Sequence, residues 1–256
     1  MEIKSNQNTK DQLNMYDYFG FPDRSQRNEL KQIVDINKIR LIKIKDKDLI
    51  FVDIILEQLN AWITHINNFS SHLGLHFLLL YYHYAQGPSD TIEIENYHNS
   101  ITIHKIYFDT FAEDTALYLI SYFDKHLEMF NDIYNLQRQS GKSHKLSRKQ
   151  IINEMKKVKI LGIIAEEYQK VLEQIEFVYI KAIRDNFVHN KSSSHFGMNV
   201  DKKETTSGIV YGCFNSKGFS TEETYIKLCS LLKIYSELCE KVNIFIDSLI
   251  KDTCQS

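Results

Sequence analysis

The residue types best suited to chemistry lie together in one stretch, Arg184-Asp185-Asn186-Phe187-Val188-His189-Asn190. It brings a permanently charged guanidinium, a carboxylate and an imidazole within two turns of a helix. An RNA phosphodiester can be cut without a metal when one group moves protons at the 2′-hydroxyl or the leaving oxygen while a cation stabilises the charge growing on the phosphorane. Because imidazole and guanidinium suit these two tasks, His189 and Arg184 are the candidate catalytic residues.

The spacing of this pair sets a condition on any site that it forms. On a regular α-helix, five residues separate Arg184 and His189 by about 140°, so they do not share one face. One site then requires a helix that loosens in its last turn, or a cleft between two copies of the chain. Asp185 lies four residues before His189, where its carboxylate can orient the imidazole and favour the protonated ring. The structural alternative is a histidine that favours the helix dipole and forms an ordinary surface ion pair.

Long segments with helical periodicity must position these residues, and they predict an all-α fold. The 256 residues include two prolines and nine glycines, and 43% of them are hydrophobic, which is ample for a buried core. Capping boxes at Ser147-Arg-Lys-Gln150 and Ser220-Thr-Glu-Glu223 mark two helix starts. Helices are expected at residues 48–84 with a break near Gly74, at 102–139 in the centre of a bundle, from 147, at 165–190 and at 220–251.

The last of these helices carries apolar residues that step alternately by three and four, the seam spacing of packed helices. These are Tyr225, Leu228, Leu232, Tyr235, Cys239, Val242, Ile246 and Leu249. Strands are a minor component, with a short strand considered at 39–45, an extended segment at 92–95 and a small hairpin around Gly208–Phe214. We expect residues 1–100 to form a helical extension that packs on a bundle formed by residues 101–256.

The motif Arg184-Asp185-x-x-x-His189 resembles the Arg-x(4 to 6)-His motif of the HEPN family, in which a polar residue often follows the arginine. It falls late in a helix of a predominantly helical chain, where that family carries it. The earlier segment Leu117-Tyr-Leu-Ile-Ser-Tyr-Phe-Asp124-Lys125 resembles the long polar-studded helix of some bacterial HEPN proteins. The resemblance covers roughly residues 102 to 250.

HEPN domains are helical bundles that commonly dimerise, and many are metal-independent endoribonucleases that act as toxins or in antiviral defence. The resemblance therefore implies an up-and-down bundle in which Arg184 and His189 are catalytic, Asp185 is supportive and two motifs meet across a dimer axis. The implied partners are RNA, a second copy and a cognate antitoxin or regulatory protein, with no cofactor. Some family members keep the fold without demonstrated activity, so the alternative is a catalytically inactive module that binds nucleotide, RNA or protein.

RNA binding requires a local basic patch, because 31 Lys and Arg residues against 33 Asp and Glu give no overall positive charge. The stretch from Arg138 to Lys159 is rich in basic residues and contains one acidic residue, Glu154. This stretch could hold an RNA backbone, and the alternative is a solvated basic face in a lysine-rich chain. The RNA-binding candidates are Lys142, Lys145, Arg148, Lys149 and Asn190.

Two further features carry polar groups that need partners. Asp124 lies on an apolar stripe of the 102–139 helix, where it either forms a salt bridge to Arg184 or Lys125 or faces solvent at the edge of the bundle. The histidines His65, His72, His76 and His83 are spaced by seven, four and seven, near one line of a helix. Only His72 and His76 are close enough to chelate together and no acid completes the set, so we expect packed or interfacial histidines and no metal.

Several function classes find no support in the chain. A lone Glu95-Asn-Tyr-His98 unit is too little for a di-iron bundle. P-loop, Rossmann and serine-hydrolase motifs do not occur. The four cysteines show no CxxC spacing and are expected to be reduced thiols. The polar start and the lack of a membrane-length apolar run predict a soluble cytoplasmic protein with no membrane partner.

Overall fold

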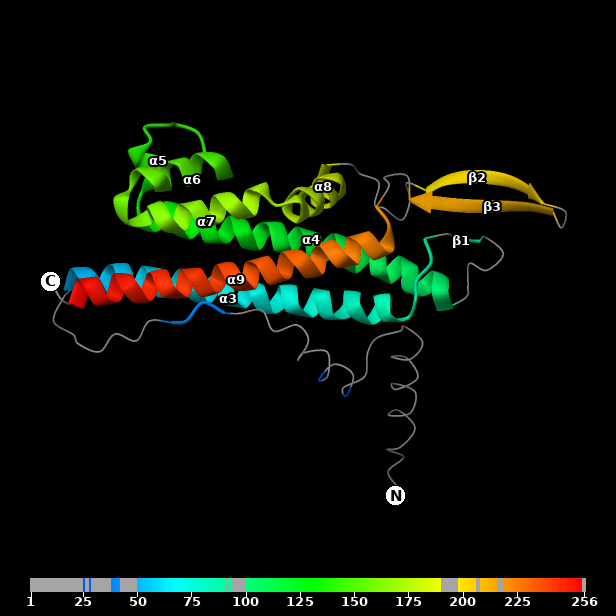
Figure 1. Cartoon of the computed structure of the whole chain (residues 1–256), viewed down its shortest axis with the longest axis horizontal. Coiled ribbons are helices and arrows are strands. Elements are labelled where there is room, and N and C mark those ends of the chain that lie inside the picture. Colours follow the sequence, from blue (N-terminus) through cyan, green and yellow to red (C-terminus); the bar gives the residue numbers. More distant parts are fainter. Residues whose placement is uncertain are drawn as a thin grey trace, which may run out of the picture. The chain divides into compact units, whose positions relative to one another are not determined.

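A computed structural model describes residues 25, 28, 38–41, 50–90, 92–93, 100–189, 198–205, 208–215 and 219–254 (Figure 1). These residues form an α-helical bundle with one small sheet, which confirms the predicted all-α class. The helices are α3 (Ile50–Ala85), α4 (Ser100–Ile133), α5 (Leu136–Gln139), α6 (Arg148–Lys157), the 3-10 helix η2 (Lys159–Leu161), α7 (Gly162–Glu173), α8 (Ile175–His189) and α9 (Thr221–Cys254).

Helix starts follow the predicted capping boxes. The Ser147 backbone N–H donates to Gln150 Oε1 at 2.9 Å, and the Glu223 backbone N–H donates to Ser220 Oγ at 3.1 Å. Asp90 adds a second cap to α9, because its Oδ1 accepts the Thr221 backbone N–H at 3.0 Å. Each bond satisfies one of the backbone donors that a helix leaves open at its first turn.

Three predicted helix interiors differ from the structure. Helix α3 runs through Gly74 without the expected break. The predicted 102–139 helix divides into α4 and α5, because Asn135 adopts the left-handed conformation (φ 49°), which asparagine tolerates better than most residues. The predicted 165–190 helix begins earlier, at Gly162, and divides into α7 and α8 at Gln174, whose backbone is extended (ψ 137°).

The sheet is antiparallel, with strand order β1-β3-β2. Its strands are β1 (Ile92–Glu93), β2 (Met198–Thr205) and β3 (Gly208–Asn215), and Figure 1 shows β2 and β3 as adjacent arrows. A hairpin is present as predicted, but Gly208–Phe214 forms only its second strand, and the first strand is β2; the extended backbone at Ile92 is confirmed. Residues 38–41 are not in a strand, and the rest of the strand considered at 39–45 lies outside the described residues.

The chain divides into two compact units, each built from separated segments. The first, here the sheet unit, includes Gly74–Thr115 and Asp185–Ile226. The second, here the helical unit, contains Ile36–Leu73, Ala116–Arg184 and Lys227–Ser256. The predicted division into residues 1–100 and 101–256 stays a prediction.

In the helical unit, α4 lies at the centre of the core, as its encircling apolar residues predicted. The Phe123 ring lies 5.6 Å from Tyr168 of α7, 5.0 Å from Phe177 of α8 and 6.0 Å from Tyr235 of α9, measured between ring centroids. The predicted α9 seam is also confirmed, since six of its eight residues are buried, namely Leu228, Leu232, Tyr235, Cys239, Val242 and Ile246. Among the described residues, no helix combines the length and apolar character needed to cross a bilayer.

Candidate functional site

Helix α8 carries the predicted catalytic residues and is anchored at its start. The Val178 backbone N–H donates to the Gln174 carbonyl at 3.1 Å, which begins the helix. Glu176 in the first turn suits the helix dipole and accepts from Lys227 of α9 at 3.1 Å. Phe177 and Ile180 are buried, so the part of α8 up to Arg184 is held in the helical unit by its apolar face.

The end of α8 brings together only part of the predicted catalytic set. Arg184 and Asp185 are both half-buried, and the backbone stays α-helical to His189. The His189 side chain and all of Asn190 lie outside the described residues. Since the helix does not unwind before His189, positions 184 and 189 remain about 140° apart around its axis. The structure therefore does not show a loosened last turn, which was one of the two alternatives, and a cleft between two copies stays a prediction.

The faces of α8 are consistent with this separation. Position 189 follows the exposed Ala182 by seven residues, which places both on one side of the helix. Ile175, seven residues before Ala182, is 67% exposed, and Val178 beside it is 58% exposed. By contrast, Arg184 follows Ile180 by four residues and Phe177 by seven, so its position adjoins the buried face. One side of α8 therefore carries an exposed apolar stripe, Ile175, Val178 and Ala182, that runs toward position 189.

Asp124 is paired as expected, but with a residue that the sequence did not indicate. Its carboxylate accepts Arg148 Nε at 2.5 Å and Arg148 Nη2 at 2.7 Å, the two-point geometry that suits a guanidinium. The Arg148 guanidinium also lies over the Phe177 ring of α8, 5.9 Å from its centroid. The proposed partners Arg184 and Lys125 are therefore wrong, and Lys125 donates to Glu128 at 2.7 Å.

The basic stretch is partly neutralised by acids from α4. Like Arg148, Lys145 forms an ion pair with an acid of α4, since its Nζ donates to Glu128 at 2.9 Å. Burial tends to raise the pKa of Glu128, but hydrogen bonds from Lys125 and Lys145 outweigh it and lower that pKa below its ordinary value. Within the described residues, Lys142 and Lys149 form no ion pair, so they are the freer of the predicted RNA-binding cations. The RNA-binding role of this stretch stays a prediction.

We expect Asp124→Ala to destabilise the protein by about 1–3 kcal/mol, because it removes both acceptors of a guanidinium that is only about one-fifth exposed. Lys145→Ala is the matched control. The Lys145 side chain is 81% exposed and Glu128 keeps Lys125, so its loss should cost less than about 0.5 kcal/mol. Urea unfolding followed by circular dichroism measures both, and equal costs would contradict the assignment.

The histidines of α3 have separate partners. His76 Nδ1 lies 3.4 Å from Asp114 Oδ2, and His83 Nδ1 lies 2.9 Å from His104 Nδ1. His65 and His72 are exposed. Over the part of the chain whose side chains are described, no three His, Cys, Asp or Glu residues gather in a way that could hold a metal.

Cys239 does not offer a reactive thiolate. It is buried in α9, and the Tyr122 hydroxyl lies 3.0 Å from its Sγ. Burial raises the pKa of the Cys239 thiol to about 11, so the group stays protonated near neutral pH. Neither Cys229 nor Cys239 forms a disulfide among the described residues, which agrees with the expectation of reduced thiols.

No protein-family model matches this chain, and comparisons with curated proteins and with solved structures found no match either. The assignment of function therefore rests on the chemistry of the chain.

The sequence did not indicate two residues that the structure brings forward. They are Phe177, whose ring lies under the Arg148 guanidinium, and the exposed Ile163 of α7. Two adjacent isoleucines, Ile163 and Ile164, were the available signal, because neighbours on a helix point about 100° apart and seldom both face one core.

Proposed function

We propose that this chain is a metal-independent endoribonuclease of HEPN type that acts in toxin systems or in antiviral defence. The observation that carries the proposal is the arrangement of Arg184, Asp185 and His189 in the closing turns of one regular helix within an α-helical bundle. Arg184 is half-buried, which suits a guanidinium that must meet a phosphate at the edge of a fold. The resemblance of the motif to that family supplies the reaction class.

In the proposed reaction, the RNA 2′-oxygen attacks the adjacent phosphorus and the bond from phosphorus to the 5′-oxygen breaks. His189 carries one of the two protons that move: it either accepts the proton of the 2′-hydroxyl while water protonates the departing 5′-oxygen, or it protonates the 5′-oxygen while water accepts the proton of the 2′-hydroxyl. Arg184 stabilises the negative charge on the phosphorane. Asp185, one turn before His189, favours the imidazolium form. The products are a 2′,3′-cyclic phosphate and a 5′-hydroxyl.

A homodimer completes this proposed site. Because positions 184 and 189 lie on different sides of α8, an arginine from one copy and a histidine from the other would form each reactive pair. The apolar stripe Ile175, Val178 and Ala182 lies on the side of position 189, and burying it against the same stripe of a second copy would favour a two-fold contact. Lys142 and Lys149 are the proposed contacts to the RNA backbone.

The test incubates the purified chain with a mixed-sequence RNA in EDTA, beside DNA of the same sequence. Cleavage of RNA that persists in EDTA, yields cyclic phosphate ends and spares DNA is the expected result, since the mechanism uses the 2′-hydroxyl and no metal. Cleavage that stops in EDTA, or that cuts DNA equally, would overturn the proposed mechanism.

A second candidate is a catalytically inactive helical module that binds nucleotide, RNA or protein. The exposed apolar stripe on α8 favours this candidate independently of the motif, because exposed aliphatic side chains in a row are typical of contact surfaces. Binding of RNA without any cleavage, in a filter-retention assay across pH and salt, would favour this second function over the first.

A further inference from the structure

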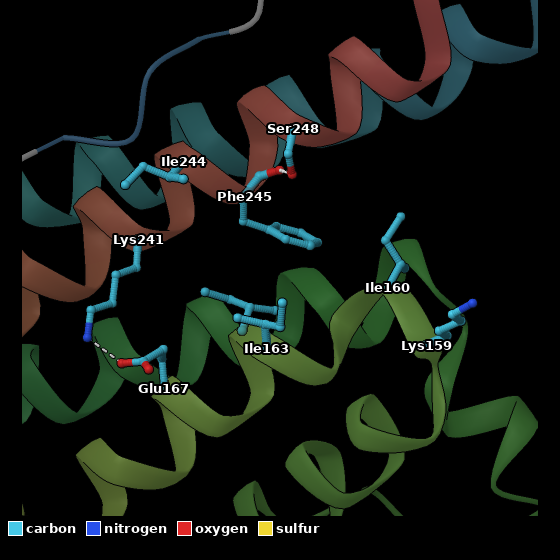
Figure 2. Close-up of a pocket in the computed structure, with 9 residues that line it drawn as sticks. Lys159, Ile160, Ile163, Glu167, Lys241, Ile244, Phe245 and Ser248 are labelled. Carbon is cyan, nitrogen blue, oxygen red and sulfur yellow. Dashed lines mark hydrogen bonds and ion pairs between the residues drawn. The ribbon is translucent and has the colours of Figure 1, made fainter. Parts of the chain in front are cut away.

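The helical unit holds an apolar groove that the ribonuclease proposal does not use. It lies between η2 and α7 on one side and the C-terminal part of α9 on the other, with a volume of about 720 Å³ (Figure 2). That volume falls in the range of small-molecule sites. Figure 2 shows Ile163 of α7 facing Phe245 of α9. The remaining apolar wall consists of Ile160, Ile164 and Ile244.

The walls of the groove expose aliphatic surface that the fold itself does not cover. Ile163 is 81% exposed and Ile160 is 46% exposed, whereas Ile164 packs into the core. Covering a large aliphatic side chain is worth about 1.5–3 kcal/mol, so a ligand that covers two of them has a substantial source of affinity. Two exposed isoleucines that face one groove are therefore a more specific feature than scattered surface apolar residues.

The two ends of the groove are charged and differ from each other. At one end Glu167 of α7 accepts from Lys241 of α9, an ion pair that joins the two helices across the groove (Figure 2). Glu167 also accepts from Lys170 at 2.6 Å, so its single negative charge is shared by two lysines. At the other end Lys159 makes no ion pair within the described residues. The lining thus carries an excess of positive charge, with one cation free to meet an anion.

We propose that this groove binds a soluble single-chain amphiphile with an anionic headgroup, such as a fatty carboxylate. The acyl chain lies along Ile160, Ile163 and Phe245, and the carboxylate pairs with Lys159. The bridge between Glu167 and Lys241 limits the length of the groove, which suits one short chain better than a helix of a protein partner. This site is independent of the proposed ribonuclease activity.

The test is calorimetric titration of the full chain with dodecanoate below its micelle-forming concentration. Ile163→Glu places a carboxylate against the acyl chain and should weaken binding at least about tenfold. Because Ile163 is so exposed, the variant should fold normally, which thermal unfolding checks. Ile226→Glu is the matched control, since this isoleucine is 50% exposed on α9 in the sheet unit and should leave dodecanoate binding unchanged.

The headgroup is tested by comparing dodecanoate with dodecanol. Wild-type protein should prefer the carboxylate, and Lys159→Gln should remove that preference. Equal losses for Ile163→Glu and Ile226→Glu, or equal binding of acid and alcohol with no effect of Lys159→Gln, would overturn the proposal. It would also be overturned if dodecanoate failed to bind while Ile163→Glu dissociated a dimer in sedimentation, because a second copy would then occupy the groove. Binding to phosphatidylglycerol vesicles without binding to free dodecanoate would equally contradict it.

Discussion

Replacing His189 with alanine is expected to lower RNA cleavage by about 10²- to 10⁴-fold, since the 2′-hydroxyl and the leaving oxygen lose their proton carrier. Arg184→Ala should lower it by about 10²- to 10³-fold, because the phosphorane charge loses its cation. Single-turnover rates in EDTA with a short labelled RNA measure the chemical step. Circular dichroism of each variant checks that the chain still folds.

Two substitutions of the same residue types serve as controls. His65→Ala and Arg40→Ala remove an exposed histidine and an exposed arginine far from the motif in sequence and outside the basic stretch, and each should change the rate less than about threefold. A loss in the controls equal to that in the motif variants would show that the motif is not the site. So would full activity of His189→Ala.

The same variants report whether the reactive pair is shared between copies. An equal mixture of the Arg184→Ala and His189→Ala proteins should regain about a quarter of the wild-type rate, because half of the dimers are mixed and each of these keeps one intact pair. The helical spacing of positions 184 and 189 motivates this result. Mixed dimers that form and stay inactive would contradict a site shared between subunits.

Local rules predicted the parts of the fold that depend on neighbouring residues. The starts of α6 and α9 follow from Ser147 and Ser220, since a capping box is complete within one turn. The buried seam of α9 follows from its three-and-four spacing. The breaks at Asn135 and Gln174 were missed because both residues are acceptable inside a helix. Packing against neighbouring helices, which the local sequence does not describe, decides whether the helix ends at these two residues.

The candidate site was predictable in its residue types and not in its contacts. The partner of Asp124 is Arg148, 24 residues further along the chain, and no periodicity links two residues on different helices. The regular end of α8 was also undecided, because a polar run after Asn190 is compatible with either a frayed or an intact last turn. The groove at Ile163 depends on which side of α7 meets α9, which the amphipathic pattern alone does not determine.

Acidification from pH 7 to pH 4 is expected to destabilise the protein by roughly 3–6 kcal/mol, because two buried histidines are neutral in the folded state. Burial, and then repulsion from His104, lowers the pKa of His83 to about 4, and burial lowers that of His126 to about 3, against 6.5 for a free side chain. The unfolded chain therefore binds protons that the folded chain excludes. Stability is complete above pH 6.5 and falls as pH decreases toward 4. Urea unfolding at fixed pH steps measures it.

The contacts of these rings explain why protonation is resisted and supply a test. The His83 and His104 rings meet through their Nδ1 atoms, so at most one of the two can carry a proton there. His126 Nδ1 lies 2.9 Å from the Tyr168 hydroxyl in the core. Carboxylates with a lowered pKa, such as Glu128, also stabilise the folded state, but this contribution to the free energy of unfolding is lost only below about pH 4.5. The slope between pH 6.5 and 4.5 therefore reports the histidines, and a flat profile there would contradict the assignment. His83→Phe, placed among aromatic rings, should reduce that slope by about 1.4 kcal/mol per pH unit.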